Sequence, residues 1–137
     1  MSVGLLLITH TGIANNLLDT AGKMLGSYTS KIKALEVPLD APTEIIKSQA
    51  EQYINDIDQG DGILILTDLY GSTPSNIGCS LLEKPDRQLI AGINLPMLVR
   101  VLNYSELTLD ELIIKAETGG KDGIIQCDCK TGKQCQK

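Results

Sequence analysis

The sequence lacks several features that would place it in common functional classes. It contains no Trp, no Phe and only four Tyr among 137 residues, so its core must be packed mainly from Leu, Ile and Val. No apolar run approaches the roughly 18 residues that a membrane-spanning helix needs. The chain also lacks a basic segment before its first apolar run. We therefore expect no signal peptide and a cytoplasmic location.

Charge and missing motifs exclude further classes. Twelve basic and 17 acidic residues give a formal net charge of −5, and no basic cluster offsets it, so nucleic-acid binding is not expected. No loop ending in Gly-Lys-Ser/Thr is present, which disfavours a P-loop nucleotide site. No Gly-x-Gly-x-x-Gly follows the first apolar run, which disfavours a dinucleotide site. His10 is the only histidine, which rules out a metal site of clustered histidines.

Apolar runs alternate with segments of helical periodicity along the whole chain. We predict strands at residues 3–10, 32–37, 63–68 and 89–94, and helices at 12–25, about 41–59, 74–84, 96–103 and 108–117, with Gly119 and Gly120 breaking the last helix and 123–127 forming a final short strand. This alternation is typical of a doubly wound, mostly parallel open α/β sheet with helices on both faces. The length fits one domain, residues 1–127, followed by a polar tail at 128–137.

The four cysteines fit no standard metal pattern. Cys79 lies within a predicted helix, where a small core residue is expected. Cys127, Cys129 and Cys135 cluster at the tail, and three thiols are one ligand short of a closed zinc site. We expect these three to be exposed and reduced, and the sequence assigns them no role.

Two predicted strands end in polar pairs, Thr9-His10 and Thr67-Asp68. If these strands are neighbours, their carboxyl ends bring His10 and Asp68 to one edge of the sheet. A carboxylate beside an imidazole fixes its tautomer and leaves the other ring nitrogen free as a nucleophile. The turn after Asp68 leads into a helix with Thr73 expected as N-cap, and helix N-termini bind phosphate. The residues alone leave two other readings open. His10 could have a purely structural role, and the turn after Asp68 could simply lead into an ordinary capped helix.

Three segments in order carry a resemblance to a known family. They are residues 8–12 (Ile-Thr-His-Thr-Gly), 67–76 (Thr-Asp-Leu-Tyr-Gly-Ser-Thr-Pro-Ser-Asn) and 90–98 (Ile-Ala-Gly-Ile-Asn-Leu-Pro-Met-Leu), with Glu-Thr-Gly at 117–119. Together they resemble the enzyme IIA component of the mannose family of the bacterial phosphoenolpyruvate:sugar phosphotransferase system, over about residues 1–127. The family fold implies an open sheet with an antiparallel edge strand near the C-terminus, exchanged between subunits of a homodimer. Residues 123–127 are the candidate for that strand.

The resemblance also implies a chemistry. His10 would take a phosphoryl group from the histidine-containing phosphocarrier protein and pass it to a separate IIB component for sugar uptake. Asp68 would hold the other ring nitrogen, and Thr73, with the backbone N–H groups of Gly71, Ser72 and Thr73, would hold the phosphoryl oxygens. Ser72 replaces a family glycine, so a positive φ there would be strained, although its hydroxyl could serve as a ligand. No metal, nucleotide or other cofactor is implied, and membrane contact would occur only through a sugar-permease complex.

Other functions remain open at this point. A regulatory IIA module would use the same phosphorylation of His10 to control a partner protein. A phosphoryl donor in a dihydroxyacetone kinase system would share the fold. A non-catalytic flavodoxin-like binding domain would show neither phosphorylation nor a pairing of His10 with Asp68.

Overall fold

A four-stranded parallel sheet forms the centre of the protein, which the computed structural model describes over residues 2–127. The strands are β1 (Gly4–His10), β2 (Ile32–Val37), β3 (Ile63–Thr67) and β4 (Arg87–Ala91). The helices are α1 (Ala14–Leu25), α2 (Thr43–Ile57), α3 (Thr73–Ser80), α4 (Leu95–Asn103) and α5 (Leu109–Asp122), and a 3₁₀ turn, η1 (Leu81–Glu83), follows α3. The predicted α/β fold is confirmed.

The strand order is β2-β1-β3-β4, with all neighbours parallel. The chain leaves β1 for β2 on one side and later returns to place β3 on the other side of β1. In register, Ile8 of β1 faces Thr67 of β3, so the two strands end together. In open α/β sheets, ligands bind beyond the carboxyl ends of strands where the order reverses in this way. The edge beyond β1 and β3 is therefore the place to look for a site.

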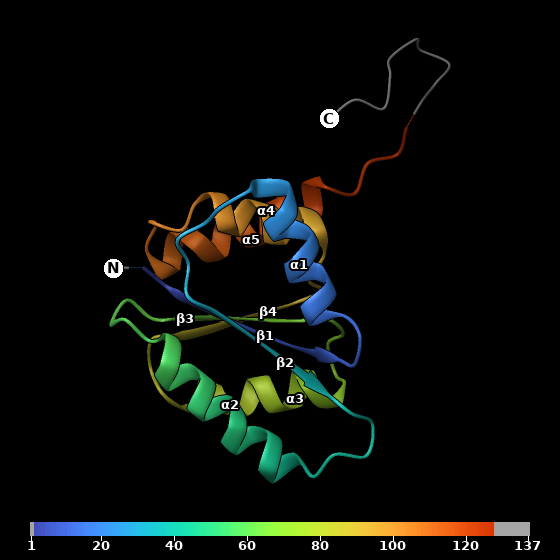
Figure 1. Cartoon of the computed structure of the whole chain (residues 1–137), viewed down its shortest axis with the longest axis vertical. Coiled ribbons are helices and arrows are strands. Elements are labelled where there is room, and N and C mark those ends of the chain that lie inside the picture. The colour runs from blue at the N-terminus through green and yellow to red at the C-terminus, as the bar shows by residue number, and fades with distance from the viewer. Residues whose placement is uncertain (1, 128–137) are drawn as a thin grey trace.

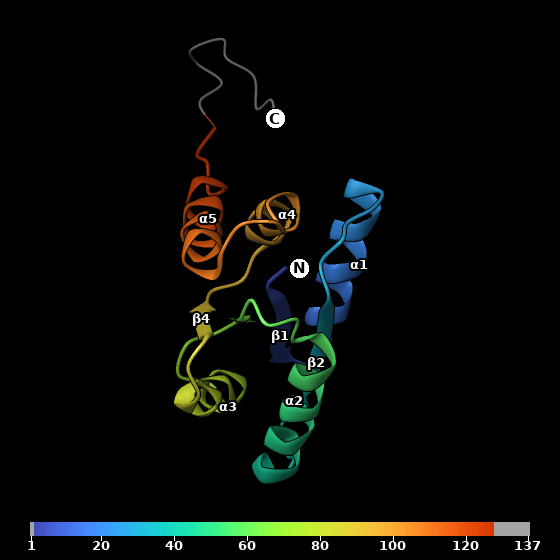
Figure 2. The ribbon, with the colours of Figure 1, turned by 90° about the vertical axis from the view of Figure 1, so that its left-hand side faces the viewer.

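Helices cover both faces of the sheet (Figures 1 and 2). Helices α1, α4 and α5 lie on one face and α2 and α3 on the other. Alternate residues of β1 serve the two layers, because Leu5 and Leu7 pack in the first core and Leu6 and Ile8 in the second. All four are fully buried, which explains why the strand is a continuous apolar run. Within residues 2–127, no helix has the length and apolar character needed to cross a bilayer.

Helix α5 does not break at its glycines, as the sequence had suggested. It continues through Gly119 and Gly120 to Asp122. A Cβ atom on Gly119 would lie 2.8 Å from Cβ of Arg100, and one on Gly120 would lie 2.9 Å from Cε of Met97. The expectation was wrong because these glycines do not end the helix. They let α4 pack closely against α5.

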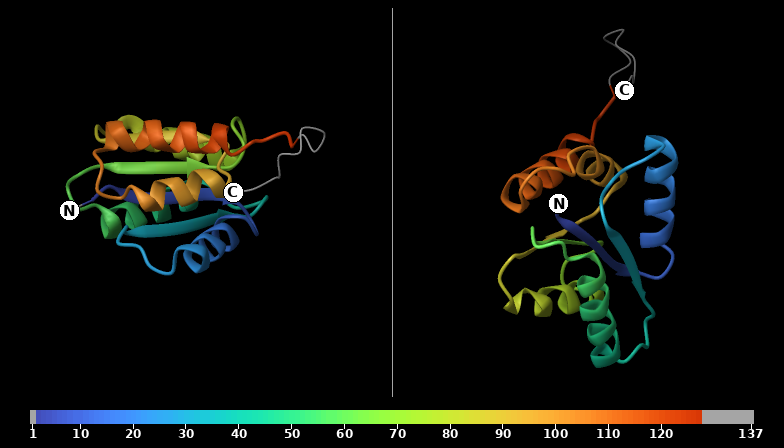
Figure 3. Two further views of the ribbon diagram at one scale, coloured as in Figure 1. Left: turned by 90° about the horizontal axis from the view of Figure 1, so that it is seen from above. Right: turned by 60° about the vertical axis from the view of Figure 1, so that its left-hand side comes forward.

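Residues 123–127 do not form the predicted edge strand in this chain. Gly123 caps α5, and the N–H of Ile124 donates to the carbonyl of Lys121 at 3.1 Å. The following residues have no regular secondary structure and lead away from the body of the molecule (Figures 1 and 3). The side chain of Ile124 is 78% exposed. The capped turn sends the chain away from its own sheet, and an exchange of this segment with a second subunit stays a prediction.

The cysteines also differ from expectation. Cys79 is free and exposed rather than buried, because α3 packs its other face, with Ser75, Ile77 and Gly78 buried. Cys127 is disulfide-bonded, so the expectation of a reduced thiol is wrong there. The predicted tail at 128–137, with its two cysteines, lies outside the described residues.

The packing of α4 on α5 leads to a stability prediction. Gly119→Ala should lower the free energy of unfolding by about 1–2 kcal/mol, because overpacking against Arg100 outweighs the higher helix propensity of Ala. Gly22→Ala in α1 is the matched control, since its added Cβ would meet only Cε2 of Tyr28, at 3.5 Å. It should raise stability by about 0.5–1 kcal/mol. Urea denaturation of the three proteins measures both changes, and equal stabilisation by the two substitutions would contradict the close packing.

Candidate active site

His10 and Asp68 form a hydrogen-bonded pair at the carboxyl ends of β1 and β3. Nδ1 of His10 lies 2.7 Å from Oδ2 of Asp68. The same oxygen accepts the backbone N–H of His10 at 2.9 Å. The side chain of His10 is 33% exposed and that of Asp68 only 11%. Asp68 therefore holds His10 through its backbone N–H and one ring nitrogen, while part of the ring stays open to solvent.

The pKa of Asp68 is held below its ordinary value. Burial opposes ionisation of the carboxyl group, but hydrogen bonds from the backbone N–H and ring of His10 and from the N–H of Leu69 outweigh it. The Leu69 N–H donates to Oδ1 at 2.9 Å. Asp68 is thus a carboxylate at neutral pH, and a carboxylate can only accept hydrogen bonds.

The tautomer of His10 follows from this. Since Asp68 only accepts, Nδ1 must carry the proton when the ring is neutral. The lone pair is then on Nε2, the nitrogen that Asp68 does not contact. This is the arrangement of an activated nucleophile whose second nitrogen is fixed by a carboxylate.

The turn after Asp68 places the start of α3 at the same edge of the sheet. Gly71 has a φ of +86°, which a glycine adopts without strain. Ser72 is the N-cap with a φ of −84°, so the concern that this position needs a positive φ does not apply. Thr73 is the first helical residue rather than the N-cap, and Pro74 is second. The predicted cap was therefore off by one residue.

The predicted phosphoryl ligands lie together here, but two of their N–H groups are occupied. The N–H of Gly71 donates to Oγ of Ser75 at 3.4 Å, and that of Ser72 donates to the carbonyl of Leu69 at 3.2 Å. The Ser72 hydroxyl also donates to this carbonyl, at 2.5 Å. Thr73 is exposed, and the first N–H groups of a helix have no partner within it. Thr73 is thus better placed than Gly71 or Ser72 to bind an anion.

Sequence reasoning missed two side chains at this edge. Glu36 of β2 accepts the N–H of Gly12 on Oε1 and that of Asn15 on Oε2, each at 3.0 Å. Buried Thr9 accepts the N–H of Ala14 at 3.0 Å. Glu36 gave no local signal, because it is distant in sequence and meets α1 only through strand pairing. Thr9, next to the histidine, could have been recognised as a residue preceding a helix.

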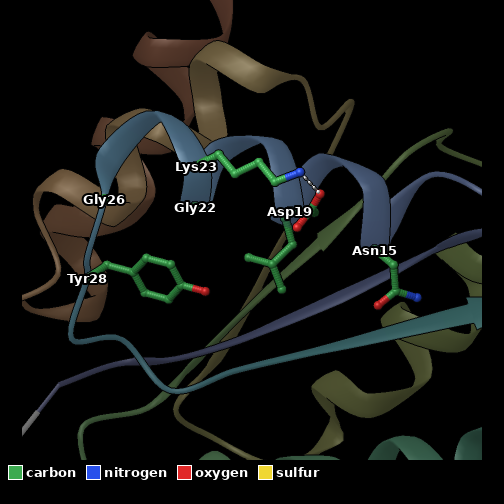
Figure 4. Close-up of a pocket in the computed structure, with 7 residues that line it drawn as sticks. Asn15, Asp19, Gly22, Lys23, Gly26 and Tyr28 are labelled. Carbon is green, nitrogen blue, oxygen red and sulfur yellow. Dashed lines mark ion pairs between the residues drawn. The ribbon is translucent and has the colours of Figure 1, made fainter.

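A hollow of about 290 Å³ borders the start of α3 and is lined by Thr73 and Asn76 of that helix and by Thr43, Glu44 and Lys47 of α2. A hollow of about 700 Å³ lies beside the outer side of α1 and is lined by Asn15, Asp19, Lys23 and Tyr28 among others (Figure 4). Its charged residues neutralise each other, since Lys23 and Asp19 form an ion pair of 3.1 Å. No group of three or more His, Cys, Asp or Glu side chains suited to a metal ion occurs within residues 2–127. The side chain of His10, 33% exposed, lies on an open edge of the sheet.

The chain is similar to known phosphotransferase-system components. Residues 4–117 match the EIIA-man family model, described as the fructose IIA component of that system. The mannose-specific EIIAB component of Escherichia coli K12 is 30% identical over 127 residues, which are 90% of this chain and 39% of that protein. The chain therefore spans about two-fifths of that relative's length. The fructose-specific EIIA component of Bacillus subtilis 168 is 26% identical over 91% of this chain and 86% of its own.

A solved structure shares the fold. The mannose/sorbose-specific IIA subunit from Enterococcus faecalis superposes with a TM-score of 0.83 at 20% identity, covering 93% of this chain and 96% of its own. The likeness extends over nearly all of both chains.

The His10–Asp68 geometry predicts one tautomer. In ¹⁵N-labelled protein, at a pH where the His10 ring is neutral, a two-bond ¹H–¹⁵N correlation spectrum of this ring should show the proton on Nδ1. In Asp68→Asn, an amide oxygen at the position of Oδ2 can still accept both the backbone N–H and the ring N–H of His10, so the proton should stay on Nδ1. Asp68→Ala removes the acceptor and should give a mixture of the two tautomers. A proton fixed on Nδ1 in Asp68→Ala as in the wild type would refute a role for Asp68 in setting the tautomer.

The pKa of Asp68 predicts how stability depends on pH. A folded-state pKa below the ordinary 3.8 means that Asp68 stabilises the fold above that pH, and that this contribution is lost as pH falls through the lower folded value. Asp68→Asn should therefore cost about 1–3 kcal/mol at neutral pH and progressively less below pH 3.8. Exposed Asp19→Asn is the control and should cost less than about 1 kcal/mol. Denaturation from pH 7 to pH 2 measures the difference, and a cost that stayed constant would contradict the argument.

Proposed function

We propose, since the chain belongs to the EIIA-man family of phosphotransferase-system IIA components, that its His10 is a transient phosphohistidine. In this proposal it receives a phosphoryl group from the histidine-containing phosphocarrier protein and passes it to a IIB component during sugar uptake. The observation that carries the proposal is the contact of Nδ1 with Asp68 at 2.7 Å. That contact leaves Nε2 unprotonated at the edge of the sheet where ligands bind.

The transfer can be written with the residues present. The Nε2 lone pair of His10 attacks the phosphorus of the donor's phosphohistidine. The N–P bond forms as the donor's N–P bond breaks, and the electron pair of that bond stays on the donor nitrogen. Asp68 stabilises the positive charge that develops on the ring as Nε2 is phosphorylated. The first turn of α3, with Thr73, would hold the phosphoryl oxygens. Transfer from His10 to the acceptor would be the same step in reverse.

The open position of the site suits a protein donor and acceptor. The histidine ring of a folded donor must come within bonding distance of His10, which an enclosed cavity would prevent. Leu69 and Tyr70, next to Asp68, are 63% and 77% exposed. Exposed apolar and aromatic groups beside a reactive residue are typical of a surface that binds another protein. A cytoplasmic location and a homodimer are part of this proposal, as the family resemblance implied.

This function predicts one phosphorylation site. Incubation with phosphoenolpyruvate, enzyme I and the phosphocarrier protein should add one acid-labile, base-stable phosphate to the wild-type chain and none to His10→Ala. Asp68→Asn should be phosphorylated about 10²- to 10³-fold more slowly, because it loses the negative charge that stabilises the positive ring formed on phosphorylation. Intact-mass analysis over time measures all three rates.

A matched control excludes the exposed thiol of α3 as the phosphorylated group. Cys79→Ser removes the exposed thiol of α3 and should be phosphorylated at the wild-type rate. A phosphorylated His10→Ala would overturn the site assignment. Mixing the phosphorylated wild type with a IIB component should return it to the unmodified mass, and retention of the phosphate would favour the regulatory alternative over transport.

A further inference from the structure

Two helix N-termini open on the edge of the sheet that carries His10. Helix α1 begins at Ala14, four residues after His10, and α3 begins at Thr73, five residues after Asp68. Each follows one of the two strands that hold the reactive pair. Helix N-termini attract anions through their free N–H groups and the helix dipole. A phosphoryl group on His10 would thus have two competing places for its charge.

The N-terminus of α1 already holds a carboxylate. Both oxygens of Glu36 are used there, one by the N–H of Gly12 and one by that of Asn15, each at 3.0 Å. Thr9 takes the N–H of Ala14 between them. The hydrogen bonds to Glu36 hold the pKa of its carboxyl group below the usual range, and the one from the N–H of Gly12 has the largest effect. The first two N–H groups of α1, those of Ala14 and Asn15, therefore already have acceptors, and a carboxylate already lies at this end of the helix dipole.

No residue of α1 itself supplies this cap. The N-cap position is Ile13, which offers no acceptor side chain, and the first turn contains no acidic residue. Glu36 reaches the helix from β2, where it pairs in register with Thr9 of β1. The same contact fixes the turn at Gly12, whose φ is +91°. A side chain from a neighbouring strand thus both caps α1 and holds the turn directly after His10.

The N-terminus of α3 differs. Its first turn has no acidic residue, and its N-cap, Ser72, makes no side-chain capping hydrogen bond within the described chain. The Ser72 hydroxyl donates instead to the carbonyl of Leu69. An anion at α3 would therefore meet no carboxylate cap, whereas an anion at α1 would have to displace one.

We propose that Glu36 is a positioning residue that closes the N-terminus of α1 to anions and so directs a phosphoryl group on His10 toward the N-terminus of α3. The phosphoryl part of this proposal rests on the proposed function. The closure of α1 concerns the unmodified protein and can be tested without any phosphoryl donor.

The test is a titration of the ¹⁵N-labelled full chain with inorganic phosphate, followed by amide chemical shifts. In the wild type, phosphate should shift the amides of Thr73 and Ser75 but not those of Gly12 and Asn15. In Glu36→Ala, the amides of Gly12 and Asn15 should also shift. The affinity for phosphate obtained from these shifts should be at least about fivefold higher than any affinity obtained from the same two amides in the wild type. Glu36→Gln keeps one acceptor oxygen and the turn but removes the charge, and should give an intermediate response.

Glu44→Gln is the matched control, because Glu44 lies in the first turn of α2 and its loss changes the net charge equally. It should leave the Gly12 and Asn15 amides unresponsive. A response at these amides in the wild type equal to that in Glu36→Ala would overturn the proposal. So would unresponsive amides in both Glu36 variants while their spectra remain those of a folded protein. Failure of His10 to be phosphorylated would instead overturn the proposed function and leave the titration result intact.

A second readout tests whether Glu36 directs the phosphoryl group on His10 toward the N-terminus of α3. Glu36→Gln should slow phosphorylation of His10 by about threefold to tenfold through the rate at saturating donor rather than through the donor's KM. The reason is that the phosphoryl group would then divide between two helix ends. An unchanged rate in this variant would show that closing α1 does not guide the phosphoryl group.

Discussion

The site depends on one oxygen atom. Oδ2 of Asp68 accepts both the backbone N–H and the ring N–H of His10, so a single carboxylate fixes where the strand ends and which way the imidazole faces. That double contact requires β1 and β3 to be adjacent, parallel and level at their carboxyl ends. The strand register meets this requirement, since Ile8 faces Thr67. Loss of the pairing would separate the two residues, which lie 58 positions apart in the sequence.

The rest of the fold keeps those two strands level. Both are fully buried on each face by two separate cores, so they cannot shift without moving a helix layer. The layer above the sheet is held by the close approach of α4 and α5 at Gly119 and Gly120. Asn94 joins the same two helices, because its side chain caps α4 at the N–H of Met97 and donates to the carbonyl of Gly120. Asn94 of the Ala-Gly-x-Asn segment and Gly119 of the Glu-Thr-Gly segment therefore act in the packing of α4 on α5.

Sequence reasoning succeeded where the determining interactions are local or follow from strand ends. The apolar runs, the helix predicted to start at 108, where Thr108 and Glu111 form a capping box, and the meeting of His10 with Asp68 all belong to this kind. It failed where distant segments decide. The glycines of α5 gave a helix-breaking signal that packing overrides, and residues 123–127 meet no edge of their own sheet, so a strand there would need the second subunit that the family resemblance implies. Glu36 could not be found at all, because its role exists only once β2 pairs with β1.

The charges around this edge show why the location of each carboxylate matters more than their number. Under the proposed function, a protein of net charge −5 must keep its own anions from repelling the phosphoryl group on His10. Asp68 is turned toward His10, so its charge would attract the positive ring that phosphorylation forms. Glu36 accepts the N–H groups of Gly12 and Asn15, which weakens its repulsion, and in our proposal it blocks the competing position. With both carboxylates committed to such partners, the uncapped start of α3 remains the favourable place for negative charge beside the histidine.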